Sequence, residues 1–134
     1  MDKPRVVLDT NIIVSALLTP GGTPAQVMSL IAHGSVQVCY NQAIFDEYEE
    51  VLSRAKFKPE ITQELKRSVL DPLRAIGLLF DVIPSVFPMK DENDRVFYDV
   101  ANKAGAFLVT GNKKHYPDEP FIVTPRDFIS EKNQ

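Results

Sequence analysis

An unbroken apolar run near the start of the chain constrains the fold most. Val6, Val7 and Leu8 follow one another without a polar residue, and Asp9 comes directly after them. A strand with one face in water would alternate, so this run predicts a strand buried on both faces, as in the interior of a parallel sheet. The carboxyl ends of parallel strands form the ligand crevice of open α/β sheets. We therefore expect the chemistry of this chain to be arranged around Asp9.

The rest of the chain alternates between helical and strand patterns. Apolar periodicity predicts helices at 12–18, 23–33, 41–55, 60–76, 91–104 and 125–129, and strands at 36–40, 80–83, 107–109 and 121–123. Thr23 and Asn41 are the expected N-caps of their helices, and Pro72 predicts a kink or an early stop. Strands alternating with helices predict a parallel sheet covered on both faces, which is an α/β/α sandwich.

Length and composition narrow the class of protein. With 134 residues, 44% hydrophobic and 25% charged, the chain predicts a single domain over 1–134. No apolar run approaches the length of a bilayer span, and the N-terminus lacks a small-residue cleavage site, so we expect a cytoplasmic protein without a membrane partner. The net charge of -3 argues against broad electrostatic binding to nucleic acid, although a local basic rim remains compatible with it.

The single cysteine has a limited range of roles. Cys39 rules out an internal disulfide and a cysteine-based metal site. It lies inside the apolar run at 36–40, which predicts a buried packing residue rather than a nucleophile.

Glu47 differs from the other acids of its helix. Asp46, Glu49 and Glu50 fall opposite the apolar stripe and predict a solvated face. Glu47 instead shares a helical row with Ile44, which turns it toward the body of the protein. The alternative, an ordinary surface glutamate, remains open on this observation alone.

Two further acids begin a later helix. Asp94 precedes Phe97 by three residues and shares its inward row, and Asp91 lies one turn earlier on the same side. N-terminal capping explains Asp91 well, because acids near a helix start satisfy free N–H groups. It explains Asp94 poorly, because an inward carboxylate needs a partner that capping does not supply.

These acids predict a metal site at one end of the sheet. Carboxylates packed together repel and raise each other's pKa unless a cation neutralises them. Asp9, Glu47 and Asp94, with Asp91 nearby, offer only oxygen ligands, which favours Mg²⁺ or Mn²⁺ over zinc. Such an ion can activate water and stabilise the transition-state charge of a phosphodiester.

Four motifs in order, VVLDTN, IFDEYEEVL, DENDRVFYDVA and LVTGNKKHYP, resemble the PIN-domain nucleases. This family includes the VapC-like toxins of bacterial toxin–antitoxin pairs. The resemblance implies a metal-dependent endoribonuclease with a five-stranded parallel sheet, usually a homodimer, and in a toxin a cognate antitoxin partner. By position it implies catalytic acids at Asp9, Glu47 and Asp94, a neighbouring acid at Asp91, polar support from Thr10, Asn11 and Thr110, and Asn112 where the family often has a fourth acid.

Basic residues lie next to the motif acids. Lys113 and Lys114 follow Asn112, and Arg95 follows Asp94, so these cations are candidates for contacts to RNA phosphates. A solvated charge run is the alternative for the lysines. For His115 a surface or capping role is favoured over that of a general base.

Two other functions compete with the nuclease. Haloacid-dehalogenase phosphatases also begin with an apolar strand ending in Asp, but they need a second Asp where this chain has Asn11, and their later acids follow the Thr and Lys instead of preceding them. A PIN-like fold that binds RNA or a protein without cutting is the stronger alternative, because Asn112 lacks a charge.

Overall fold

The computed structural model describes residues 3–132, in which five strands form one parallel sheet. The strands are β1 (Arg5–Leu8), β2 (Gln37–Tyr40), β3 (Leu78–Leu79), β4 (Phe107–Val109) and β5 (Ile122–Val123). They lie in the order β3-β2-β1-β4-β5, so β1 is central and β3 and β5 are the edges. The predicted five-stranded parallel sheet is therefore confirmed.

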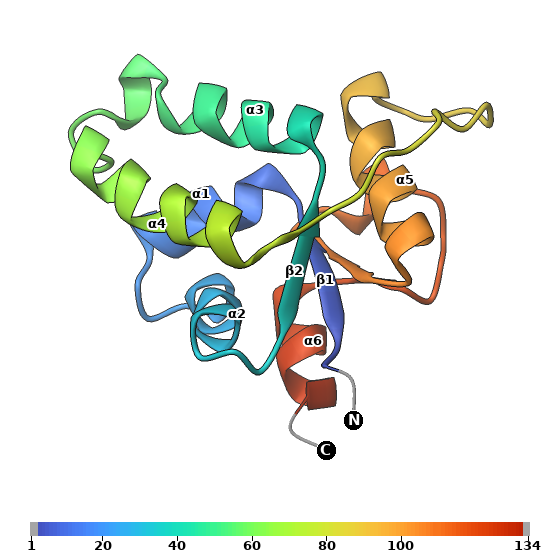
Figure 1. Cartoon of the computed structure of the whole chain (residues 1–134), viewed down its shortest axis with the longest axis horizontal. Coiled ribbons are helices and arrows are strands. Elements are labelled where there is room, and N and C mark those ends of the chain that lie inside the picture. Colours follow the sequence, from blue (N-terminus) through green and yellow to red (C-terminus); the bar gives the residue numbers. More distant parts are fainter. Residues whose placement is uncertain (1–2, 133–134) are drawn as a thin grey trace.

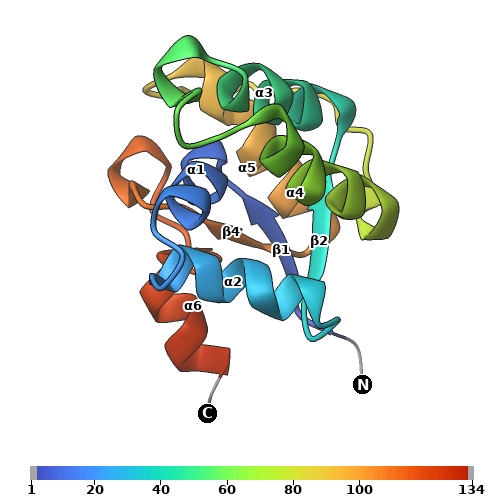
Figure 2. The same ribbon diagram turned by 90° about the vertical axis from the view of Figure 1, so that its left-hand side faces the viewer.

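Helices cover both faces of this sheet. They are α1 (Thr10–Leu18), α2 (Thr23–Ala32), α3 (Gln42–Leu52), α4 (Gln63–Ile76), α5 (Arg95–Ala104) and α6 (Pro125–Lys132). In Figure 1, α5 lies to the right of strands β1 and β2. On the left of these strands lie α1, α2 and α4, and α3 runs along the top. Figure 2 shows α1 and α2 in front of the strands and α5 behind them. This arrangement confirms the three-layer α/β/α sandwich.

Three short 3-10 helices complete the part of the chain that the structure describes. They are η1 (Ala55–Phe57), η2 (Glu92–Asp94) and η3 (Lys113–His115). None of the helices within residues 3–132 combines the length and the hydrophobicity that crossing a bilayer requires.

The central strand is buried as its apolar run predicts. Val6, Val7 and Leu8 are each 0% exposed, and burial of such a side chain stabilises the fold by about 1.5–3 kcal/mol. The Tyr48 hydroxyl of α3 donates a 2.6 Å hydrogen bond to the Leu8 carbonyl. This buried bond holds α3, and with it Glu47, beside the carboxyl end of β1. Cys39 of β2 is also fully buried, in agreement with a packing role.

The two predicted N-caps have different outcomes. Asn41 caps α3, because its side-chain oxygen accepts a 2.9 Å hydrogen bond from the Ile44 N–H. Thr23 is instead the first residue of α2, and Gly22 is the N-cap without a side-chain bond. The helix capped by Asn41 ends at Leu52, so the predicted extension of its stripe to residue 55 is wrong.

The next helix begins later than predicted and is not shortened by its proline. Thr62 caps α4, accepting a 3.1 Å bond from the Leu65 N–H, so the helix begins at Gln63 rather than at residue 60. Pro72 lies inside α4, which continues to Ile76. The helix therefore does not stop early at this proline.

The third strand lies before its predicted position at 80–83. Leu79 pairs with Tyr40, and the Phe80 N–H donates a 2.9 Å bond to the Tyr40 carbonyl. Strand β2 ends at Tyr40 because Asn41 begins the helix cap. Residues beyond Phe80 therefore have no neighbouring strand with which to pair, and 80–83 is irregular.

The predicted helix at 91–104 is divided into two parts. Asp91 caps the 3-10 turn η2, its Oδ1 accepting a 3.0 Å bond from the Asn93 N–H, and α5 begins only at Arg95. The predicted stop at Gly105 is confirmed. Its φ of 63° is left-handed, a conformation that glycine adopts without strain at the end of a helix.

Candidate active site

Asp9 lies at the carboxyl end of β1, held by residues from the far end of the chain. Its backbone N–H donates to the Val109 carbonyl at 3.0 Å, which continues the pairing of β1 with β4. Its Oδ2 accepts bonds from the Thr110 hydroxyl at 2.8 Å and the Tyr116 hydroxyl at 3.1 Å. Two hydroxyl donors on one oxygen fix the direction of the carboxylate.

Glu47 faces the same end of the sheet from α3. It is half-buried, whereas Asp46 and Glu49 are exposed, as their helical rows predict. The Thr10 hydroxyl at the start of α1 donates a hydrogen bond to its Oε2. Burial, and in addition the charge of Asp9, raises the pKa of Glu47, while the Thr10 bond acts in the opposite direction.

Asp94 supplies an unsatisfied carboxylate oxygen. Its Oδ2 is buried and has no hydrogen-bond partner among the described residues. The His115 ring lies close by, with its Nδ1 3.6 Å from this oxygen. Burial, followed by the charges of Asp9 and Asp91, raises the pKa of Asp94 from 3.8 to about 6. Electrostatic coupling therefore links Asp94 to Asp9 and, more weakly, to Glu47.

Three other predicted residues are exposed. Asp91 has one carboxylate oxygen occupied by its cap, and Asn11 lies on the outer side of α1. Asn112 is exposed as well, but its backbone N–H donates to Thr110 Oγ1 at 3.0 Å and its side-chain Nδ2 lies 2.9 Å from His115 Nε2. Asn112 therefore contacts the site through Thr110 and His115. Asp91 acts as the N-cap of η2.

The candidate RNA contacts differ in their availability. Lys113 and Lys114 are exposed in η3, directly after Asn112. Arg95 is already engaged, because its guanidinium donates to Glu92 and to the carbonyl and hydroxyl oxygens of Ser85. Its side chain is only 12% exposed. The structure thus favours the two lysines over Arg95 as contacts to a phosphate.

Sequence reasoning missed Tyr116, whereas His115 is exposed, in agreement with a surface position, although its ring lies near Asp94. Tyr116 is buried, and burial together with the charges of Asp9 and Asp94 raises the pKa of its hydroxyl, so it remains a donor. The His115 ring lies between two groups of the site, with its Nε2 2.9 Å from Asn112 Nδ2 and its Nδ1 3.6 Å from Asp94 Oδ2. The only available signal was an aromatic residue at the end of the LVTGNKKHYP motif.

The acids fit a divalent cation in chemistry, although they do not form a closed cage. Within residues 3–132, no group of three or more His, Cys, Asp or Glu side chains lies close enough to hold an ion. Magnesium usually keeps several waters and uses one or two protein carboxylates, so such a cage is not required. The orphaned Asp94 oxygen is the observation that favours a cation, because a buried carboxylate oxygen without a donor is unfavourable.

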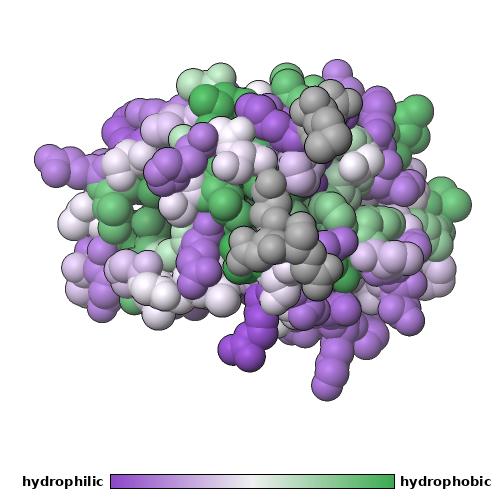
Figure 3. Space-filling model, turned by 90° about the horizontal axis from the view of Figure 1, so that it is seen from below, coloured by the Kyte–Doolittle hydropathy of each residue, from purple (hydrophilic) through white to green (hydrophobic). Residues whose placement is uncertain are grey.

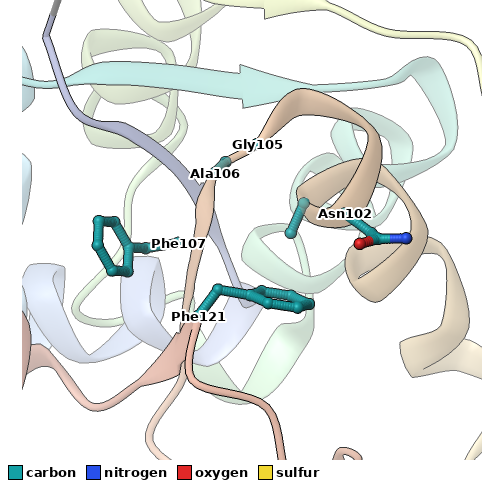
Figure 4. Close-up of a pocket in the computed structure, with 6 residues that line it drawn as sticks. Asn102, Gly105, Ala106, Phe107 and Phe121 are labelled. Carbon is teal, nitrogen blue, oxygen red and sulfur yellow. The ribbon is translucent and has the colours of Figure 1, made fainter.

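Two cavities lie apart from the acids. One, of about 250 Å³, is found beside the amino end of β4 (Figure 4) and is lined by Ala101, Asn102, Gly105, Ala106, Phe107 and Phe121. The other, of about 340 Å³, is an apolar groove between α2 and α4 that includes Met28, Val69, Pro72 and Ile76. Seen from below, hydrophobic residues gather beside a hollow on the side of α2 and α4 (Figure 3). Neither lining contains a titratable side chain, so neither cavity is a candidate for the chemistry.

Comparison with known proteins identifies the class. Residues 5–114 match a family model described as a PIN domain, and the chain therefore belongs to the PIN-domain family. PIN domains are generally nucleases, and they generally use divalent metal ions.

Individual relatives agree with this assignment. The chain is 26% identical over 142 residues to the uncharacterized protein MJ1680 of Methanocaldococcus jannaschii, a match that covers 96% of this chain and 92% of the relative. Its fold resembles a chain in the crystal structure of VapBC2 from Rickettsia felis bound to a DNA fragment from their promoter. That match has a TM-score of 0.56 and 18% identity over 90% of this chain and 96% of the other, and it shows the shared fold.

Proposed function

We propose that this PIN domain is a metal-dependent endoribonuclease that hydrolyses phosphodiester bonds of RNA. The observation that carries the proposal is the buried Oδ2 of Asp94, which has no hydrogen-bond partner among the described residues and whose carboxyl is electrostatically coupled to Asp9 and Glu47. One or two of these carboxylates would hold Mg²⁺ or Mn²⁺, with water completing the coordination, because no three of them lie close enough to share an ion within residues 3–132. When bound, the cation supplies positive charge that stabilises the charge developing on the phosphate.

The protein's own groups orient the acids. Thr110 and Tyr116 donate hydrogen bonds to Oδ2 of Asp9, and Thr10 donates one to Oε2 of Glu47. The carboxylates of Asp9 and Glu47 are therefore already oriented when the substrate binds. The raised pKa of Glu47 makes its carboxylate a better proton acceptor than an exposed glutamate. The exposed Lys113 and Lys114 would bind phosphates beside the acids.

We further propose a cellular role as the cytoplasmic toxin of a toxin–antitoxin pair. The fold shared with the VapBC2 chain supports this role, and the family resemblance supports a homodimer. Expression of the wild-type chain in a bacterial host should arrest growth, whereas expression of Asp9→Asn should not. Light scattering of the purified protein measures its oligomeric state.

Cleavage of a labelled RNA tests the activity. The wild type should cut in Mn²⁺ and stop when EDTA is added, and Asp9→Asn and Asp94→Asn should retain the fold but lose cutting. Glu49→Gln, on the exposed face of α3, is the matched control and should cut normally. Retention of RNA without cleavage in Mn²⁺ would assign the domain to binding alone, the alternative that Asn112 raises.

A further inference from the structure

Positive charge is concentrated between α3 and α4. Residues 53–67 contain five cations, Arg54, Lys56, Lys58, Lys66 and Arg67, and two acids, Glu60 and Glu64, which gives this segment a net charge of +3. Since the whole chain carries -3, the remaining residues carry -6. Only Arg54 of these cations pairs with a carboxylate among the described residues, through an exposed bridge to Glu50 at 3.0 Å.

A cavity of mixed polar and apolar lining opens within this segment. Its volume is about 540 Å³, larger than that of the cavity beside β4 or of the groove between α2 and α4. Its lining combines a lysine, two hydroxyls and an amide with apolar side chains: Leu52, Ser53, Lys58, Ile61, Thr62 and Gln63. The lysine, the hydroxyls and the amide supply the donors that an anion requires.

A buried lysine contacts one of the side chains that line this cavity. Lys66 is 9% exposed, and its ammonium donates a 2.9 Å bond to the Ser53 hydroxyl oxygen, a side chain that lines the cavity. No carboxylate within residues 3–132 pairs with Lys66. Because the Ser53 oxygen accepts from an ammonium, its own hydrogen is polarised and is left to donate to an acceptor. The amino end of α4 adds the free N–H groups of Gln63 and Glu64.

The cavity lies farther along the helix that carries Glu47. Glu47 and Ser53 belong to the same helix and its C-cap, six residues apart, which corresponds to about 9 Å along the axis. Figure 1 shows α3 running along the top of the molecule from the end of β2 to the segment that leads into α4. Six residues turn an α-helix by about one and two-thirds revolutions, so Ser53 faces a different side of α3 from Glu47, and an RNA strand that contacts both has to wrap partly around the helix.

We propose that this cavity binds a phosphate of the same RNA strand, away from the scissile one, through Lys58, Ser53 and the amino end of α4. The inference rests on the proposed function in taking RNA as the substrate. A phosphate site in this basic segment explains how a chain of net charge -3 binds a polyanion, because the acids repel phosphate while the basic segment attracts it.

RNA binding without cleavage tests this site. Anisotropy of a labelled single-stranded RNA is measured in EDTA over a range of NaCl concentrations. Lys58→Gln should weaken binding about fivefold and lower the slope of log affinity against log salt by about 0.7, the loss of a single phosphate contact. Lys66→Met should weaken binding as well, with its fold checked by thermal melting. Arg126→Gln, an equal change of charge on α6, is the control and should bind like the wild type.

Amide shifts locate the contact and separate the two proposals. On titration with RNA, the ¹⁵N-labelled protein should show shifted amides at Gln63 and Glu64. The phosphate site is overturned if the salt slope of Lys58→Gln equals that of the wild type, or if the amide chemical shifts of Gln63 and Glu64 do not change with RNA. Either result counts even if the wild type cuts RNA in Mn²⁺. Loss of RNA binding in Lys58→Gln supports the site even if the wild type never cuts. Tighter binding of polyglutamate than of RNA would assign the cavity to an acidic protein and overturn the proposal.

Discussion

Replacement of Asp94 by Asn should stabilise the protein in the absence of metal. Raising the pKa of Asp94 from 3.8 to about 6 means that ionising it in the folded state costs on the order of 3 kcal/mol, at about 1.4 kcal/mol per tenfold change in proton affinity. The side chain is 15% exposed, so solvent screens this effect only in part. The amide must itself be hydrogen-bonded and loses the attraction of His115, which leaves an expected gain of about 1–2 kcal/mol.

The gain should depend on pH in a defined direction. Because the folded protein binds the Asp94 proton more tightly than the unfolded chain, wild-type stability falls as pH rises from about 3.8 through about 6. The amide that replaces this carboxylate in the variant does not titrate. The difference between variant and wild type should therefore be fully present above pH 6 and disappear near pH 4.

Urea denaturation in EDTA at pH 7.5 and pH 4 measures this difference. Glu49→Gln, on the exposed face of α3, should change stability at neither pH. With excess Mn²⁺ the wild type should become more stable than Asp94→Asn, because the wild type gains the free energy of cation binding and the variant largely does not. A variant less stable than the wild type at pH 7.5 in EDTA would refute the reasoning, since Asp94 would then be a structural acceptor. An equal gain at both pH values would show that ionisation is not its cause.

Cation binding, the charges around it and the packing of one glycine can each be tested separately. The melting temperature of the wild type should rise in millimolar Mn²⁺ at neutral pH, and no rise would count against an acidic cation site. Asn112→Asp should tighten Mn²⁺ binding in calorimetric titrations because it adds a charge beside the acids; an unchanged affinity would place residue 112 outside the site. Asp9→Asn should lower the pKa of Asp94 below about 6 in an NMR titration, because the charge of Asp9 helps to raise it. Gly77→Ala should reduce the free energy of unfolding by about 1–3 kcal/mol, because its Cβ would lie 2.6 Å from a ring carbon of Tyr40; unchanged stability would show that this ring can move.

The sequence predicts those parts of the fold that depend on local pattern. The apolar run of β1 and the Asn41 cap are confirmed because each is decided within a few residues. The third strand lies at Leu78–Leu79 instead of the predicted 80–83, because an edge strand extends only as far as its neighbour does. Strand β2 ends at Tyr40, and no pattern within 80–83 contains that information.

The same distinction separates the acids from their supports. Helical rows distinguish Glu47 from Glu49, because burial of a helix face repeats along the sequence. The partners of the acids do not repeat in this way: Thr10 reaches Glu47 across 37 residues and Tyr116 reaches Asp9 across 107. Such contacts exist because α1, α3 and the loop after β4 all meet where β1 ends, so the topology of the sheet decides them. A tyrosine after a basic stretch therefore becomes a donor to Asp9 only through the pairing of β1 with β4.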